Sequence, residues 1–494
     1  MTHSSFGRRG LVLPGLLVAI ALASGAMVGL TADFDGSGWW QLPIFMLAGS
    51  SALLIWVRLS VADGITRYVG FGMAMLLACG VNRAIYATDY LVNGSSFADW
   101  PLTSMSPARD LFMAEVITLT GTFLTFFVWL AAGGARLSSD CVGEVRRSRS
   151  VQRRFLCLYG LSLLATLFLL ARPDAASSLG AAVPAVNALG VGALFFLTRQ
   201  MSWSGLRKVV VHLALSIPYL LLAVQNTGKE AMIIALLPVA LTAWFALPRT
   251  SARISLAIGG LVVIAVVSNL STYMRVMTWG VDKRTASVGE LVTEFLTVSH
   301  QLGHAETGRV GVTSFLSRAN ASGYRGYAVT LAETEGRHPE LVYGPLAYVF
   351  IPRLLWSDKP SIDPGKEYTS LVFGRYVDSS MSAGFYTSFY VGAGWFGVLS
   401  GAVVLGLLIV ALSRAAARLG GQAFLALFSF VLLPVAVRID EGWGAATLAG
   451  LLVTFMYSCA AWVAATLLAQ TGAALMSSSR DRRVGRQTAG VGPA

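Results

Sequence analysis

Two cations stand at the end of an apolar stretch that runs from residue 341 to residue 366. The sequence there, LVYGPLAYVFIPRLLWSDKPSIDPGK, passes from aliphatic and aromatic residues to Pro352 and Arg353, and Lys359 follows Trp356. Proline fixes its φ angle, so the chain turns at a defined place. A charge beside apolar surface is costly unless it has a partner. The pattern predicts that Arg353 and Lys359 hold an anionic ligand, and Arg353 is our first candidate for a functional residue.

Other cations are expected on the same face of the protein. Lys229 follows Thr227 and Gly228, which resemble a helix N-terminus, where free N–H groups and the helix dipole favour an anion. Guanidinium groups donate to phosphate in a planar fork, and one cation about 4 Å from a phosphate charge contributes ~4 kcal/mol at an effective dielectric constant of ~20. The alternative is that each cation only lies at a helix end or pairs with a nearby acid. The predicted anion site, which needs no metal, consists of Lys229, Arg275, Arg318, Lys359 and Arg438.

A pair of histidines is the second candidate for chemistry. His300 and His304, in SHQLGHAE, are four residues apart and would share one face of a helix. This spacing can bind zinc, but the chain has no HExxH motif. We favour a role as general base or sugar contact, because imidazole accepts a proton near neutral pH. With Arg353, both histidines are therefore candidate catalytic residues. Carboxylates that could act as the base instead are Glu230, Asp358, Asp363 and Glu441.

Three further polar residues have plain structural interpretations. His212 lies within an apolar segment and is expected to be a core histidine. His338 precedes a proline and is expected in a turn. Glu115 is rare as a carboxylate inside an apolar segment, and we expect it to pair with a neighbouring charge.

The composition predicts a polytopic, all-α membrane protein. Hydrophobic residues make up 55% of the 494 residues, charged residues only 13%, and the mean hydropathy is +0.66. Apolar runs of about 17 to 25 residues recur, and each can cross a bilayer as a helix. The net charge of +12 comes mostly from short loops between these runs, which points to membrane topology rather than to nucleic acid.

About twelve transmembrane helices are predicted. They are grouped as spans 1–9 in residues 1–270, a long extracytoplasmic loop in 271–385, spans 10–12 in 386–470 and a basic tail in 471–494. The predicted spans are 11–30, 40–57, 68–88, 111–132, 155–171, 180–198, 209–226, 231–248, 254–272, 386–412, 421–437 and 444–469.

The distribution of Arg and Lys predicts the orientation. Segments that would be cytoplasmic carry 21 of these residues, and the short outer loops carry five, among them Arg83 and Arg109. Short loops rich in Arg and Lys stay inside. Both termini are therefore expected in the cytoplasm, with the active face outside.

The long outer loop is expected to hold short helices. Residues 287–304 show a helical stripe, and residues 311–335 suggest one or two helices broken near Gly323. Residues 343–356 are too short to span and too apolar for water, so we interpret them as interfacial or re-entrant. The tail from residue 477 is basic and is expected to be disordered.

The segments discussed above resemble a known family. GPLAYVFIPRLLWSDKP, preceded by SFLSRAN and followed by FYTSFYVGAGWFGVLSGAVVLGLL, is similar to the bacterial O-antigen polymerases (Wzy-type), the oligosaccharide repeat-unit polymerases. The family has a late Pro-Arg element in its large loop and then a Gly-rich span, here with Gly392, Gly394 and Gly397. TGKEAMIIALLP is similar to a Gly-Ser-Arg span start, with Lys229 in place of Arg.

The resemblance implies a GT-C-like, metal-independent membrane glycosyltransferase without a cofactor. It would move a glycan from undecaprenyl diphosphate to another lipid-linked repeat unit in the bacterial inner membrane. The cations would hold the departing diphosphate, and a histidine or carboxylate would activate the acceptor hydroxyl. Its partners would be the lipid-linked donor and acceptor, with a chain-length regulator and a flippase as further candidates and no nucleic acid.

Two alternatives remain open. An O-antigen ligase-like transferase shares the chemistry and differs in its acceptor. A polysaccharide flippase or another transporter belongs to a different class, but we find no internal repeat that would indicate inverted symmetry. The sequence also contains no Walker A loop and no dinucleotide-binding fingerprint, which argues against nucleotide-driven transport.

Overall fold

A computed structural model describes much of the chain as helix. The described residues are 41–62, 71–93, 108–133, 148–172, 182–200, 203–225, 322–347, 356, 364–373, 382–432 and 442–489, with isolated positions at 235–236, 239–240, 242–243, 293, 435–436 and 439. No strand occurs among them. Five helices in this part of the chain are long and apolar enough to cross a membrane: Arg109–Ala131, Arg149–Ala171, Gly205–Ala223, Phe385–Val431 and Gly444–Ala474. The prediction of an α-helical membrane protein is confirmed at this level.

The helices belong to two compact units. Unit 1 comprises Met1–Ser139, Thr297–Ala415 and Leu432–Val453, and unit 2 comprises Asp140–Leu296, Ala416–Val431 and Thr454–Ala494. Unit 1 thus joins the first helices to part of the long predicted loop. Its helices are α2 (Gln41–Ala62), α3 (Phe71–Asn93), α5 (Ala108–Ala131), α15 (Ser322–Thr334), α16 (Pro339–Tyr343), a 3-10 turn (Pro345–Ala347), α17 (Pro364–Phe373) and the beginnings of α18 (Phe385–Val431) and α20 (Gly444–Ala489).

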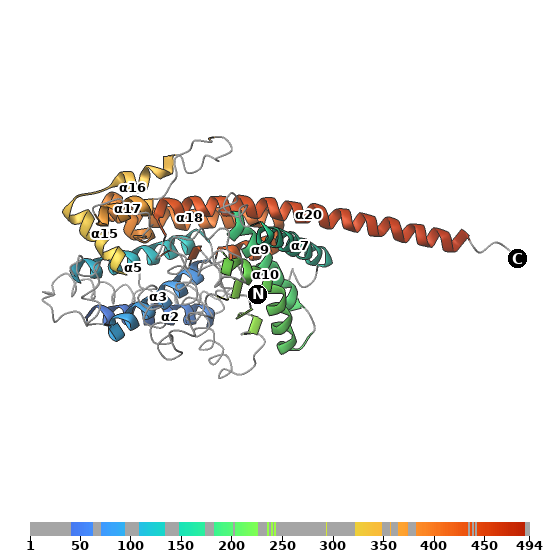
Figure 1. The fold of residues 1–494 in the computed structure, drawn as a ribbon, viewed down its shortest axis with the longest axis horizontal. Helices are drawn as coiled ribbons and strands as arrows, with labels where there is room; N and C mark the ends of the chain where they lie inside the picture. The colour runs from blue at the N-terminus through green and yellow to red at the C-terminus, as the bar shows by residue number, and fades with distance from the viewer. Residues whose placement is uncertain are drawn as a thin grey trace, which may run out of the picture. The chain divides into compact units, whose positions relative to one another are not determined.

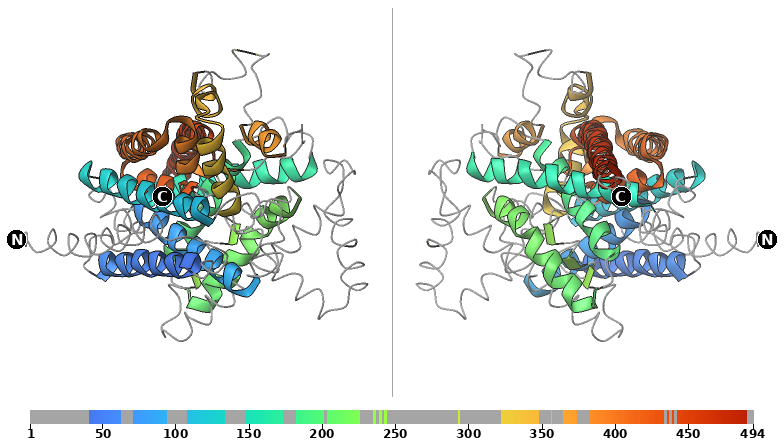
Figure 2. Two further views of the ribbon diagram at one scale, coloured as in Figure 1. Left: turned by 90° about the vertical axis from the view of Figure 1, so that its left-hand side faces the viewer. Right: turned by 90° about the vertical axis from the view of Figure 1, so that its right-hand side faces the viewer.

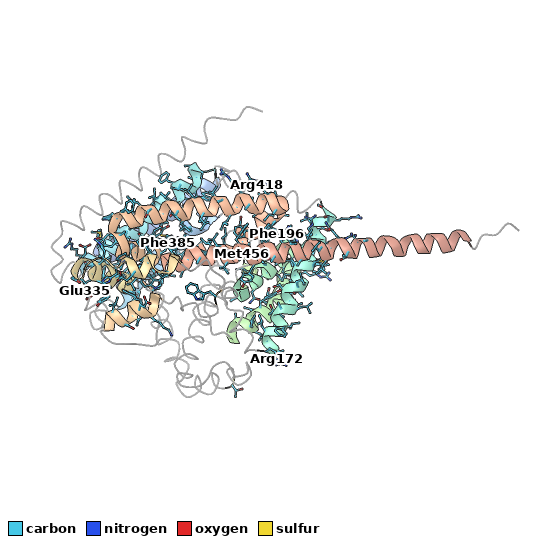
Figure 3. All side chains as sticks on the ribbon, turned by 90° about the horizontal axis from the view of Figure 1, so that it is seen from above. Arg172, Phe196, Glu335, Phe385, Arg418 and Met456 are labelled. Carbon is cyan, nitrogen blue, oxygen red and sulfur yellow. The ribbon has the colours of Figure 1, made fainter. Side chains whose placement is uncertain are left out.

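Within unit 1, α2 packs on α3, and α15 packs on α5 (Figures 1 and 2). The contact with α15 is close because Gly326 faces α5. A Cβ atom at residue 326 would come within 3.2 Å of the Leu111 Cα atom. Absence of a side chain lets the two backbones approach, as small residues do in membrane helix pairs. Figure 3 labels Glu335, just after α15, and Phe385, the first residue of α18.

A single positive φ angle folds α18 back on itself. Gly394 has φ +61°, a conformation that favours glycine. The Phe389 carbonyl oxygen consequently lies 2.1 Å from the position that a Gly397 Cβ would occupy, although eight residues of straight helix would separate them by about 12 Å. A second positive φ, +66°, occurs at Gly421. This break falls at the predicted start of a separate span, 421–437.

The other predicted spans correspond to helices where they are described. Spans 40–57, 68–88 and 111–132 match α2, α3 and α5, and spans 155–171, 180–198 and 209–226 match α7 (Arg149–Ala171), α9 (Ala182–Gln200) and α10 (Gly205–Gln225). Spans 11–30 and 254–272 lie outside the described residues, as does most of span 231–248. The helix expected in 311–335 corresponds to α15, and only Thr293 of the 287–304 stripe is described.

The basic tail differs from the expectation of disorder. Helix α20 continues without interruption to Ala489 and includes Arg480 and Arg486 (Figure 1). Alanine, arginine and glutamine in this stretch have high helix propensity, and the helix is already nucleated by the apolar segment before them.

Unit 2 is held together by polar contacts between α7, α9 and α10. The Tyr219 hydroxyl donates to Ser162 Oγ at 3.2 Å, and both side chains lie where a Gly190 Cβ would be, within 2.5 Å of it. Thr166 donates to Asn187 at 3.0 Å. Such hydroxyl and amide bonds, together with a small residue at the crossing point, are typical of helix pairs in membranes.

Candidate functional site

The residues predicted for catalysis and diphosphate binding all fall outside the part of the chain that the structure describes. Their predicted roles therefore stay predictions. These residues are Arg353, His300, His304, Lys229, Arg275, Arg318, Lys359 and Arg438.

The described residues contain a different cluster of charges, buried in unit 1. Glu115 on α5 lies between Arg83 on α3 and Arg325 on α15. Arg83 Nε is 3.2 Å from Glu115 Oε2, and Arg325 Nη2 donates to Glu115 Oε1. All three side chains are fully buried. We call these three residues the ion cluster.

Each arginine has further contacts. Arg83 Nη1 donates to the Cys79 carbonyl oxygen at 2.9 Å and approaches Cys79 Sγ at 2.7 Å. The guanidinium of Arg325 lies over the Tyr86 ring, with its Cζ atom 5.1 Å from the ring centroid. A guanidinium on an aromatic face is attracted by the ring quadrupole, more strongly when desolvated. The cluster thus joins three helices through ionic, hydrogen-bonding and cation–π contacts.

The approach of α15 to α5 explains why Arg325 reaches Glu115. Arg325 precedes Gly326, which packs against Leu111 of α5, and Thr330 lies further along α15. The Thr330 hydroxyl donates to Asp110 Oδ2 at 2.7 Å. The two helices therefore run antiparallel, with the pair 325–115 at one end of the contact and 330–110 at the other.

A second polar network ties the end of α15 to α18. The Tyr390 hydroxyl donates to Glu333 Oε1 at 2.6 Å, and Arg337 Nη2 donates to the same oxygen at 3.0 Å. Arg337 also lies 4.4 Å from the Tyr390 ring centroid. The hydrogen bond from Tyr390, and then the charge of Arg337, lower the pKa of Glu333. We call Glu333, Arg337 and Tyr390 the outer network.

The residues just before the first motif stretch pack on the second stretch in unit 1. Val342 and Tyr343, which directly precede Gly344, lie 3.1 Å from the position of a Gly392 Cβ, and the Tyr343 ring is 6.2 Å from the Phe389 ring. The backbone N–H of His338 donates to the Val391 carbonyl oxygen at 2.9 Å. A Cβ at position 392 would require Val342 and Tyr343 to shift by a few tenths of an ångström.

The structure also locates three residues with plain structural interpretations. His338 precedes α16 as its N-cap residue, and its Nδ1 atom is 3.0 Å from Glu340 Oε1, as expected for a turn. His212 is buried, and its Nδ1 atom lies 2.8 Å from Thr242 Oγ1 and 3.2 Å from Thr198 Oγ1. Glu115 pairs with neighbouring charges, as expected.

Sequence reasoning missed two of the three cluster residues. Arg83 is within α3 and buried, so it is not the loop charge that the count of outer cations assumed. Its signal was an arginine inside an apolar segment. Arg325 was counted only as one of the loop charges, although the flanking Gly323 and Gly326 are typical of a close helix contact.

The ion cluster is suited to positioning rather than to proton transfer. Both oxygens of Glu115 face guanidinium groups, so the carboxylate is poorly placed to accept a proton from a substrate hydroxyl. Within the described residues, no group of three or more His, Cys, Asp or Glu side chains could hold a metal ion. The cluster fixes α15 relative to α3 and α5.

Fold and site together define an α-helical membrane protein that contains a buried ion cluster. Comparison of the chain with family models, with curated proteins and with solved structures found no match.

Proposed function

We propose that this protein is an inner-membrane glycosyltransferase that polymerises undecaprenyl-diphosphate-linked oligosaccharide repeat units. The observation that carries the proposal is the pair of motif stretches, GPLAYVFIPRLLWSDKP and FYTSFYVGAGWFG, in a chain with membrane-spanning helices. The packing of Val342 and Tyr343 on Gly392 supports it, because these two residues directly precede the first stretch and contact the second.

In the proposed reaction, the hydroxyl of an acceptor sugar attacks the anomeric carbon of the donor glycan. The bond from this carbon to the diphosphate oxygen breaks, and undecaprenyl diphosphate leaves with the electron pair. Arg353, Lys229, Arg275, Arg318, Lys359 and Arg438 would stabilise the leaving diphosphate. His300, His304 or a carboxylate would take the acceptor proton.

The test is the glycan pattern of a strain in which only the Arg353→Ala variant is expressed. We expect normal abundance in the membrane but no long chains, with Arg353→Lys partly active because lysine keeps the charge and loses the planar fork. Arg153→Ala is a matched control, since Arg153 is exposed on α7. Normal chain lengths with Arg353→Ala at normal abundance would contradict the assignment of this residue.

A strain that lacks the protein separates the proposal from its alternatives. Loss of a polymerase leaves single repeat units on the cell surface. Loss of a flippase leaves none there, and loss of a ligase leaves polymer on its lipid carrier. Only the first pattern is compatible with the proposed function.

A further inference from the structure

One side of α18 is an apolar stripe that is exposed among the residues of unit 1 that the structure describes. Phe396 is 77% exposed, and Leu399, Val403 and Leu407 are also exposed. These residues follow one another at intervals of three or four, so they share one face of a helix. A stripe of this kind, on a helix long and apolar enough to span, fits acyl chains.

The two ends of the stripe carry residues typical of membrane boundaries. Trp395 comes directly before it and is 39% exposed, and tryptophan is enriched where lipid meets water. Arg414 follows it and donates to the Ala132 carbonyl oxygen, at the end of α5, at 2.6 Å. Trp395 and Arg414 are nineteen residues apart, about 28 Å of helix, which matches the hydrocarbon thickness of ~30 Å.

Polar contacts also lie near one end of α5 and of α15. At the other end of α5, Asp110 accepts a hydrogen bond from the Thr330 hydroxyl. On α15, side chains are buried or half-buried from Gly323 to Ala332 and exposed at Glu333 and Thr334. Glu333 in turn is bonded to Tyr390, whose ring is 5.9 Å from the Trp395 ring. Polar side chains of α5, α15 and α18 are thus linked to one another near the ends of these helices.

We propose that a membrane–water boundary crosses unit 1 at the level of Trp395, so that α15 is a re-entrant helix and acyl chains cover the Phe396–Leu407 stripe. Glu115 lies five residues inside α5 from Asp110, about 7 to 8 Å deeper. Arg325 lies eight residues back along α15 from Glu333, about 12 Å deeper. The ion cluster is thus at hydrocarbon depth, shielded by the surrounding helices. This placement does not depend on the proposed reaction.

A boundary further along α18 would fail on two counts. If it crossed at Val403, the strongly exposed Phe396 and Leu399 would stand in water, at a cost of about 25 cal/mol for each Å² of apolar surface. Only eleven residues would then separate the boundary from Arg414, about 17 Å of helix, too short to cross the hydrocarbon layer.

Nitroxide labels on the full-length protein in lipid nanodiscs test the proposal. Single cysteines would replace Phe396, Leu407 and Thr334, with Cys141, Cys157 and Cys459 changed to serine and the buried Cys79 retained. The protein that carries only the three cysteine-to-serine changes is the control for labelling of Cys79. Collision rates with oxygen, which enters lipid, and with a water-soluble nickel chelate give the depth of each label.

We expect the Phe396 label within about 5 Å of the headgroups. The Leu407 label should lie near the middle of the bilayer, because Leu407 is eleven residues, about 16 Å of helix, further along α18. The Thr334 label should be fully accessible to nickel. A Phe396 label as accessible to nickel as the Thr334 label would overturn the proposal, because α15 would then lie in water. A Phe396 label at the bilayer centre, or a Thr334 label protected from nickel, would equally overturn it. A variant is included only if its thermal unfolding transition matches that of the protein with the three cysteine-to-serine changes alone.

Discussion

The ion cluster is the feature at residue scale with the largest predicted effect on stability. Removing one member of a buried ion pair leaves the other charge uncompensated, which costs about 3–5 kcal/mol. We expect Arg325→Ala and Glu115→Ala each to lower the free energy of unfolding by about this amount. Denaturation of the purified protein in mixed micelles, followed by circular dichroism, measures it.

Two variants control this prediction. Arg153→Ala removes an exposed arginine and should change the free energy of unfolding by less than about 0.5 kcal/mol. Arg325→Lys should lose less stability than Arg325→Ala, because lysine keeps a positive charge beside Glu115. An Arg325→Ala protein as stable as Arg153→Ala would show that the pair does not hold α15 in place.

Residues of the cluster also show how far the sequence could predict the site. Glu115 stood out because a carboxylate in an apolar segment is rare, and its pairing with a charge was predicted. Its partner Arg325 is 210 residues away, and nothing in the local pattern of either residue specifies the other. Long-range pairing of this kind is set by helix packing, which depends on small residues such as Gly326 and not on hydropathy.

At the scale of elements, the contact between α5 and α15 depends on Gly326. A Cβ there would lie 2.3 Å from Leu111 Cδ2 and 3.2 Å from Leu111 Cα. Because backbone cannot move aside as a flexible side chain can, we expect Gly326→Ala to destabilise the protein by about 1–3 kcal/mol. Thermal unfolding of the purified protein measures the loss.

Gly450→Ala is the matched control for this substitution. Gly450 lies within α20, also in unit 1, and its added Cβ would have nothing within 4 Å. Alanine is the better helix former by up to about 1 kcal/mol, so this variant should be as stable as the wild type or more so. Equal effects of the two substitutions would argue against close packing of α15 on α5.

The outer network predicts an acid-sensitive contact between α15 and α18. Because the pKa of Glu333 is lowered in the folded protein, its contribution to stability is complete above the ordinary value of 4.5 and is lost as pH falls through the lower folded value. We expect amide exchange in residues 322–347 to increase below about pH 4 relative to the rest of unit 1.

Glu333→Gln separates this effect from general acid denaturation. Glutamine does not titrate, so the extra exchange at low pH should disappear, while the charges nearby, Arg109, Asp110 and Arg337, are kept. The same acid response in wild type and Glu333→Gln would assign it to another group.

At the scale of the whole molecule, the charge distribution predicts two cytoplasmic termini. A reporter that is active only in the cytoplasm should work after Ala494, and one that is active only outside should work when inserted near residue 300. Activity of the outside reporter at the C-terminus would reverse the orientation and, with it, the side on which the proposed reaction occurs.

Hydropathy predicted the class of fold because the bilayer requires long apolar helices. It could not predict the fold-back at Gly394, where a single φ angle and the packing of Phe389 decide the direction of the chain. It also missed the extension of α20 to Ala489, because a basic and polar composition is compatible with an exposed helix as well as with a disordered tail.

The ion cluster also imposes an order on synthesis. Glu115 follows Arg83 by only 32 residues, but Arg325 follows Glu115 by 210 residues. At ~5–20 residues per second, this interval is about 10 to 40 s. During that time the nascent chain contains the carboxylate and only one of its two guanidinium partners. The insertion machinery therefore first receives the pair of Arg83 and Glu115. The ion cluster is completed late in translation, when α15 brings Arg325.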